Sequence, residues 1–191
     1  MVSRRTLGSL GALILIIAAP QISTDAFADV IGRASVIDAD TIEIHGQRIR
    51  LHGIDAPEKG QPCFDEVGKS YQCGRQAALA LDEFIGMSPV RCRERDRDRY
   101  GRTVADCSVR GEDIELWLVR GGHAMAYRKY SNDYIAAEQE ARNAKRGIWI
   151  GKVQPPWEWR KSLRDAGYNS SLLTAPRAVG GDAAGPVGSS K

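Results

Sequence analysis

Hydrophobic and polar residues alternate early in the chain, and this alternation predicts three short strands between Val30 and Leu51. Residues two apart on a strand point to the same face, so a strand with one buried face carries apolar residues at every second position. The last two predicted strands meet this condition around a turn at His45 and Gly46. Their shared apolar face consists of Ile42, Ile44, Ile49 and Leu51. We therefore expect these strands to cover a hydrophobic core.

Apolar residues recur at helical spacing in three later segments. The spacing predicts helices over residues 77–85, 114–118 and 134–144. Pro89 would follow the end of the first helix, and one of the polar residues at 131–133 would cap the start of the third.

The chain contains four cysteines and no C-x-x-C pair, which argues against a zinc site and for disulfides in an oxidising compartment. Two further strands are expected to form a hairpin around a turn at 98–101. Folding this hairpin about its midpoint places Cys92 opposite Cys107. Of the three possible pairings we therefore expect Cys92–Cys107, which leaves Cys63 and Cys73 to close a short loop.

The order of these elements is three strands, a helix, two strands and two helices. This order predicts an α+β protein built on an OB-fold, a five-stranded β-barrel, with about three helices around it. Such barrels bind DNA, RNA, oligosaccharides or proteins, so the fold alone does not identify the function.

Composition excludes some classes of protein. The 191 residues are 42% hydrophobic and 27% charged, which is typical of one globular domain with tails. The 27 basic residues face 24 acidic residues, and the net charge of +3 argues against a cationic DNA-packaging protein. Any nucleic-acid site must therefore be a local patch.

The N-terminus has the pattern of an export signal. Two arginines precede an apolar run shorter than the ~20 residues that span a bilayer, and an A-x-A cleavage pattern follows at 26–28. We expect a signal peptide over 1–28, an OB-fold domain over 29–164 and a disordered Gly/Ala/Ser-rich tail over 165–191. The mature protein is then a secreted or periplasmic monomer that has no contact with the membrane after cleavage.

Three polar segments carry the candidate chemistry: residues 36–41, 50–58 and 98–102. Together they hold oxygen ligands suited to a hard cation such as Ca²⁺, and arginines whose planar guanidinium suits a phosphoryl group. The carboxylates are Asp40, Asp55 and Glu58, and the arginines are Arg50 and Arg102. Read singly, each segment could be only a polar turn, a shaped loop or a solvated hairpin. Their occurrence together, in this order, favours a site for phosphoryl chemistry.

The same segments resemble the active-site pattern of the staphylococcal nuclease, or thermonuclease-like, family, which reads D-G-D-T, R-x-x-x-x-D-x-P-E and D-K-Y-G-R. The resemblance extends from about Ile31 to Trp149. It implies a Ca²⁺-dependent hydrolase that cleaves DNA and RNA phosphodiesters to products ending in 3′-phosphate, with single-stranded substrates favoured.

The resemblance also assigns roles to individual residues. It implies that Asp40 and Asp55 bind Ca²⁺ together with the backbone carbonyl of Ala56. Glu58 would orient or deprotonate the attacking water. The arginines that would stabilise the pentacoordinate phosphorus and the departing 5′-oxygen are Arg50 and Arg102.

Three further residues are candidates for substrate binding. Arg99 ends a row of arginines at every second position from 91 to 99, which could follow a phosphate backbone. The alternative is a solvated hairpin tip, because acidic residues alternate with the arginines. Tyr100 and Tyr127 could stack on a base or meet a terminal phosphate, as similarly placed tyrosines do in the family, or they could be half-buried packing residues.

The chain departs from the family pattern without losing a catalytic side chain. Ala39 stands where the family often has glycine, and Ala56 stands where staphylococcal nuclease has threonine. The segment from Cys63 to Cys73 lies in a region where staphylococcal nuclease has no cysteine. The sequence leaves open a rival function, a non-catalytic OB-fold module that binds nucleic acid or oligosaccharide in the cell envelope.

Overall fold

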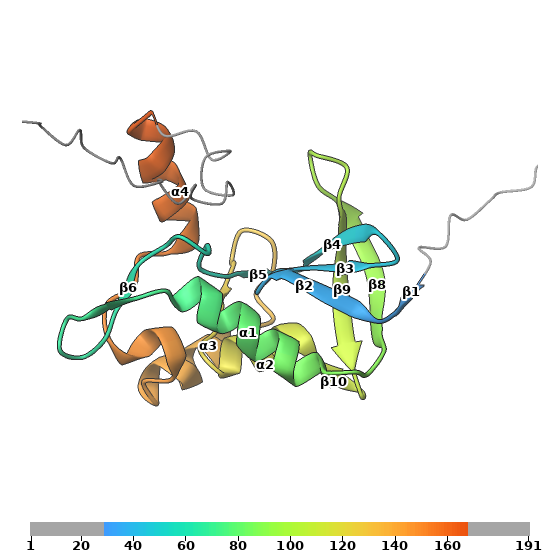
Figure 1. Ribbon diagram of the computed structural model, residues 1–191, viewed down its shortest axis with the longest axis horizontal. Coiled ribbons are helices and arrows are strands. Elements are labelled where there is room, and N and C mark those ends of the chain that lie inside the picture. The colour runs from blue at the N-terminus through green and yellow to red at the C-terminus, as the bar shows by residue number, and fades with distance from the viewer. Residues whose placement is uncertain (1–28, 168–191) are drawn as a thin grey trace, which may run out of the picture.

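Six strands of the computed structural model, which describes residues 29–167, form the main path of one sheet in the order β1-β8-β9-β4-β3-β2 (Figure 1). All neighbours are antiparallel except β4 and β9, which are parallel. Only Arg33 separates β1 from β2, so the two ends of this order are consecutive in the chain. The strands are β1 (Asp29–Gly32), β2 (Ala34–Asp38), β3 (Thr41–Ile44), β4 (Gln47–Leu51), β8 (Val90–Arg97) and β9 (Thr103–Val109), with the short β10 (Glu112–Asp113) paired to β9. The protein is therefore α+β, and its sheet has the connectivity of a five-stranded OB-fold, with β1 and β2 as halves of one strand.

The apolar face predicted from the alternating pattern is buried. Ile42 lies opposite Ile49 across β3 and β4. All four predicted aliphatic side chains are at most 1% exposed. The turn that joins these strands has positive φ at both His45 (53°) and Gly46 (79°), as a two-residue hairpin turn requires.

Two pairs of two-residue strands lie outside the main sheet. β5 (Ile54–Asp55) pairs with β11 (Met125–Ala126), and β6 (Cys63–Phe64) pairs with β7 (Ser70–Tyr71). Strands of two residues are too short to show an alternating pattern, which is why the sequence did not predict them.

The helices pack around the sheet and exceed the predicted number. Three of them follow the predicted segments: α1 packs on β2, α2 on β9, and α3 on α2. The prediction that a polar residue at 131–133 caps α3 is wrong, because Tyr134 holds that position without a side-chain hydrogen bond. A further helix, α4, follows the 3₁₀ turn η1 and projects away from the others (Figure 1). The bounds are α1 (Cys73–Ile85), α2 (Ile114–Arg120), α3 (Ile135–Asn143), η1 (Gly147–Ile150) and α4 (Pro156–Asp165).

Two disulfides connect elements that the site depends on. Cys63 is joined to Cys73, and Cys92 to Cys107, as expected from the sequence. The first bridge ties β6 to the start of α1, and the second joins opposite residues of β8 and β9.

The predicted signal peptide and most of the predicted tail, residues 168–191, lie outside the described residues. Among residues 29–167, no helix combines the length and the apolar character that crossing a membrane requires.

Candidate active site

Arg50 on β4 holds two acidic residues together. The β3–β4 pairing places it opposite Thr41, so that it lies beside Asp40 at the start of β3. Its guanidinium forms one ion pair with Asp40 and a second, at 2.7 Å from Nη2, with Asp55 on β5. Asp55 is fully buried and Asp40 is only 6% exposed. Arg50 lies between the buried Ile49 and Leu51 of β4, and two carboxylates converge on its guanidinium.

The backbone next to Asp55 orients Asp40. The Ala56 N–H donates a hydrogen bond to Asp40 Oδ2 at 2.9 Å, and the Thr41 hydroxyl donates to Asp40 Oδ1 at 3.2 Å. Because the first of these bonds uses the backbone, alanine at position 56 retains it. The structure therefore brings four of the predicted site residues into contact: Asp40, Arg50, Asp55 and Ala56.

The carboxylates differ in their electrostatic surroundings. Burial acts to raise the pKa of Asp40, but the charge of Arg50 and the hydrogen bonds from Arg50 and Ala56 outweigh it and hold the pKa below its ordinary value. Burial and the nearby charge of Asp40 raise the pKa of Asp55. Burial also raises the pKa of Glu58, against the opposing hydrogen bond from Arg160. The two aspartates are thus close enough for the charge of one to disfavour ionisation of the other.

Arg160, on α4, is the functional residue that sequence reasoning missed. Its Nη1 donates to Asp55 Oδ1 at 3.2 Å and to Glu58 Oε1 at 2.7 Å, while Nη2 donates to Asp55 Oδ2 at 2.7 Å. It follows Asp55 by 105 residues and lies in a helix that the hydrophobic pattern did not predict. The nearby tryptophans were the available signal, because they indicate a segment that packs onto the domain. Arg160 thus links the predicted water-activating residue to the predicted cation ligand.

The oxygen atoms of these residues are the kind of ligand that a hard cation prefers. Asp40 and Asp55 supply carboxylate oxygens on either side of one guanidinium, and Glu58 is tied to Asp55 through another. Within residues 29–167, no three His, Cys, Asp or Glu side chains are arranged as a preformed metal site. Guanidinium groups bridge the carboxylates instead. The residues that would hold a cation are Asp40, Asp55 and the Ala56 carbonyl, with Glu58 beside them.

The second predicted catalytic arginine, Arg102, lies at the tip of the β8–β9 hairpin. Its Nε donates to Asp98 Oδ2 at 2.7 Å, and Asp98 Oδ1 accepts hydrogen bonds from the backbone N–H groups of Tyr100 and Arg102, both at 2.9 Å. The guanidinium groups of Arg99 and Arg102 lie over the Tyr100 ring, at 4.8 and 5.8 Å from its centroid. In the described part of the chain, no hydrogen bond or ion pair connects Arg102 to the carboxylates of the site.

Tyr127 is packed against α4. Its ring stacks on Trp157 with centroids 5.1 Å apart and an angle of 4° between the planes, and Tyr130 meets it edge-on at 5.0 Å. One face of Tyr127 is therefore taken by a protein side chain. The exposed ring beside it belongs to Tyr130, which is 61% exposed.

The row of arginines on β8 is largely neutralised by acidic residues. A bulge between Glu94 and Asp96 also breaks the alternation. The pairs are Arg91 with Asp29, Arg93 and Arg95 with Asp106, and Arg97 with Glu94. Of the row, Arg99 at the turn is left for contact with a phosphate backbone, consistent with the hairpin tip as the local cationic patch.

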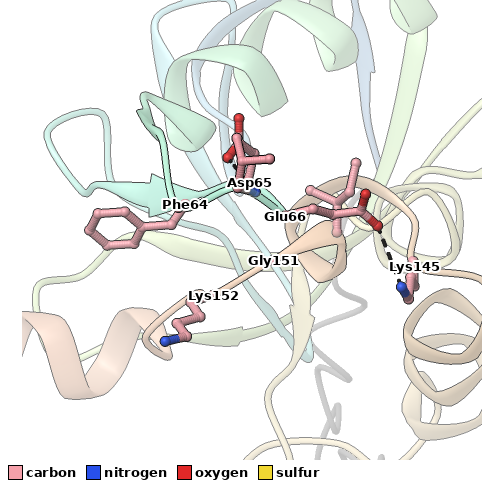
Figure 2. Close-up of a pocket in the computed structure, with 9 residues that line it drawn as sticks. Phe64, Asp65, Glu66, Lys145, Gly151 and Lys152 are labelled. Atoms are coloured by element: carbon pink, nitrogen blue, oxygen red, sulfur yellow. Dashed lines mark hydrogen bonds and ion pairs between the residues drawn. The ribbon is translucent and has the colours of Figure 1, made fainter.

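A broad surface depression lies away from these residues, lined by residues 64–68, Lys145 and 150–152 (Figure 2). Its charged residues Glu66 and Lys145 pair with each other at 3.4 Å, and none of the predicted site residues lines it. The predicted site residues therefore lie outside this depression.

Comparison with known proteins gives consistent matches. The profile of the family described as "Staphylococcal nuclease homologue" matches residues 48–151. The chain is 44% identical over 159 residues to succinoglycan biosynthesis protein ExoI of Rhizobium meliloti (strain 1021), covering 80% of this chain and 78% of that protein. It is 32% identical over 174 residues to a micrococcal nuclease of Shigella flexneri, covering 81% of this chain and 91% of that one.

An uncharacterized endonuclease of Escherichia coli O157:H7 is 35% identical over 142 residues, which cover 70% of this chain and 86% of that protein. Staphylococcal-like nucleases of Oryza sativa also match, and the chain spans about a third of their length. The profile match includes most of β4, β5 and the β8–β9 hairpin, whereas Asp40 and α4 lie outside it.

Proposed function

The chain belongs to the staphylococcal nuclease family, and on that premise we propose that it is an exported, Ca²⁺-dependent nuclease that hydrolyses DNA and RNA phosphodiester bonds to products ending in 3′-phosphate. The observation that carries the proposal is the buried pair of Asp40 and Asp55 on Arg50, with Glu58 beside it. Burying charged carboxylates costs stability. A module that only binds nucleic acid would have no use for two buried carboxylates of this kind.

The residues of the site support an in-line displacement at phosphorus. Asp40, Asp55 and the Ala56 carbonyl would hold the cation, which when bound neutralises charge on a non-bridging phosphoryl oxygen. Glu58 would accept a proton from the attacking water, and the raised pKa that burial causes makes its carboxylate a better base. The new bond joins the water oxygen to phosphorus, and the bond to the 5′-oxygen breaks.

The arginines would stabilise the charge that develops during this step. Arg50 is held beside the carboxylates by its two ion pairs and would face the equatorial phosphoryl oxygens. Arg102 would reach the leaving 5′-oxygen from the hairpin tip, releasing Asp98 to do so. Arg99 and Tyr100 on the same turn, with Tyr127, are the proposed contacts to the rest of a single strand.

Export is part of the proposal. Residues 1–28 have the pattern of a signal peptide, and two disulfides among residues 29–167 are compatible with an oxidising compartment. We expect a secreted or periplasmic monomer. Fractionation of cells that express the full chain should place the processed protein outside the cytoplasm with both disulfides formed.

A rival proposal draws on one observation. The relative with 44% identity is named a succinoglycan biosynthesis protein, which favours a role in the cell envelope in which the OB-fold holds oligosaccharide or nucleic acid without cutting it. In that case the protein would bind its ligand and leave DNA intact.

The deciding experiment is hydrolysis of a 5′-labelled single-stranded DNA by residues 29–191, in about 10 mM Ca²⁺ and in chelator. We expect cleavage only with Ca²⁺, and fragments that migrate as 3′-phosphates. Glu58→Gln and Arg102→Ala should each lower kcat by about 100-fold or more. The control Arg48→Ala removes an exposed arginine on the same strand as Arg50 and should leave kcat unchanged.

Two results would contradict the proposal. Near-wild-type rates in both Glu58→Gln and Arg102→Ala would remove the assigned roles. DNA or oligosaccharide binding without any cleavage would favour the envelope module.

A further inference from the structure

α4 places a permanent positive charge inside the carboxylate cluster. Arg160 donates three hydrogen bonds, two to Asp55 and one to Glu58. Two contacts hold this part of the chain against the domain. Trp157 stacks on Tyr127, and the side chain of Gln61 donates to the carbonyl of Gln154 at 2.6 Å. The guanidinium is thus positioned by packing that does not depend on its own ion pairs.

Both oxygens of Asp55 are occupied by arginine. Oδ1 accepts from Arg50 and from Arg160, and Oδ2 accepts from Arg160. The Asp55 side chain has no exposed surface, whereas that of Arg160 is 32% exposed. A cation that binds Asp55 therefore competes with Arg160 for the Asp55 oxygens.

Charge balance makes this exchange reasonable. Three carboxylates, Asp40, Asp55 and Glu58, face two guanidinium groups, so the cluster carries one net negative charge. Adding a divalent cation while Arg160 stays would place a third cationic group against Asp55, beside the two guanidinium groups that already share it, and these groups repel each other more strongly at low dielectric. Removing Arg160 without a replacement would leave Glu58 without its ion pair and the buried Asp55 with Arg50 alone, which is also costly.

We propose that Arg160 and the divalent cation compete for Asp55, so that Arg160 lowers the cation affinity of the site. The inference rests on the proposed nuclease function. Without the cation, Arg160 neutralises and orients Asp55 and Glu58. Cation binding displaces the guanidinium, and the apparent affinity is reduced by the fraction of molecules in which Arg160 is bound.

The test is calorimetric titration of the protein with Ca²⁺. Arg160→Met keeps much of the length of the side chain and removes its charge, and should lower the Kd for Ca²⁺ by about tenfold or more. Arg160→Lys keeps the charge but cannot form the paired contacts, and should give an intermediate Kd. The matched control Lys161→Met removes an exposed charge from the next position of α4 and should change the Kd by less than about twofold.

Thermal unfolding distinguishes this role from a purely structural ion pair. In chelator, Arg160→Met should melt below the wild type, because Glu58 loses its ion pair and Asp55 keeps only Arg50. With saturating Ca²⁺ the difference should disappear or reverse. A structural ion pair would lower Tm equally in both conditions.

The outcomes separate the two proposals. If the wild type cleaves DNA with Ca²⁺ but Arg160→Met binds Ca²⁺ no more tightly, the inference about Arg160 is wrong and the nuclease function stands. If no variant binds Ca²⁺ and the wild type does not cleave, both proposals fail. If Arg160→Met does not fold, the Kd of Arg160→Lys decides: a value equal to or above that of the wild type overturns the inference.

Discussion

Identical side chains acquire different properties from their immediate neighbours in this protein. Asp40 and Asp55 are both buried, yet the pKa of Asp40 is lowered and that of Asp55 is raised. Arg50 and a backbone N–H outweigh burial at Asp40, whereas burial and the charge of Asp40 prevail at Asp55. The pKa of a buried carboxylate here therefore depends on the hydrogen-bond donors and charges around it as much as on its burial.

A buried carboxyl outside the site gives a prediction at the same scale. Glu115 on α2 is fully buried and accepts hydrogen bonds from the Cys107 N–H at 3.0 and 3.2 Å. Burial, with a smaller effect of Asp113, raises its pKa well above the ordinary value. Its contribution to stability is therefore fully present below the unfolded-state pKa and is lost as the pH rises through the folded-state pKa.

Glu115→Gln removes this titration while keeping a side-chain oxygen to accept the Cys107 N–H. We expect the free energy of unfolding of the wild type to fall, relative to the variant, as the pH rises from about 5 to 9. Urea unfolding at a series of pH values measures the difference. The exposed Glu112→Gln serves as the control, and parallel curves for wild type and Glu115→Gln would show that the carboxyl does not titrate in this range.

At the scale of elements, the start of α1 supports the loop that carries Glu58. Gly74, in the first turn, lies so close that a Cβ there would be 2.3 Å from the carbonyl oxygens of both Pro57 and Glu58. The disulfide from Cys73 to Cys63 fixes the same end of the helix. The helix start therefore determines the position of the backbone from which Glu58 reaches Arg160.

Gly74→Ala should push this loop away and misplace Glu58. We expect kcat to fall by about tenfold or more, since displacements of about 1 Å at a reacting group are costly. Overpacking should also lower the free energy of unfolding by about 1–3 kcal/mol. Single-turnover cleavage and urea unfolding give the two values, with the neighbouring exposed Arg75→Ala as control. Unchanged cleavage in a folded Gly74→Ala protein would show that the loop tolerates the shift.

The helices also show where sequence patterns reach their limit. α1, α2 and α3 bury apolar residues at helical spacing, so their segments could be predicted. In α4 only Pro156 is buried, and the helix is held by the stacking of Trp157 and by the ion pairs of Arg160. The apolar face of α4 consists of only a few partly buried residues, Trp157, Trp159 and Leu163, and so short a pattern was not recognised as a helix.

At the scale of the whole molecule, the two disulfides are expected to supply much of the stability. They close segments with separations of 10 and 15 residues, which corresponds to about 3 kcal/mol each in the chain-entropy account. Reduction should therefore lower Tm by more than about 10 °C for a domain of this size. Circular dichroism melts with and without reductant, with free thiols counted in the same samples, provide the measurement. An unchanged Tm after complete reduction would show that packing alone holds the domain.

The sequence by itself determined the features that depend on local spacing. Alternation placed Ile42 and Ile49 in the core, the hairpin set Cys92 opposite Cys107, and three short segments identified the acidic residues of the site. These features follow from local chain geometry, because the direction of a side chain repeats every two residues on a strand and about every 3.6 on a helix.

Only the tertiary structure decided which distant groups share the site. The parallel pairing of β4 with β9 joins strands far apart in the chain. Arg160 reaches Asp55 across 105 residues, while Arg102, expected at the same place, pairs with Asp98 on the hairpin. Such contacts depend on the summed free energy of packing over the whole domain. No periodic pattern records that sum, so the contact of Arg160 with Asp55 could be found only in the folded chain.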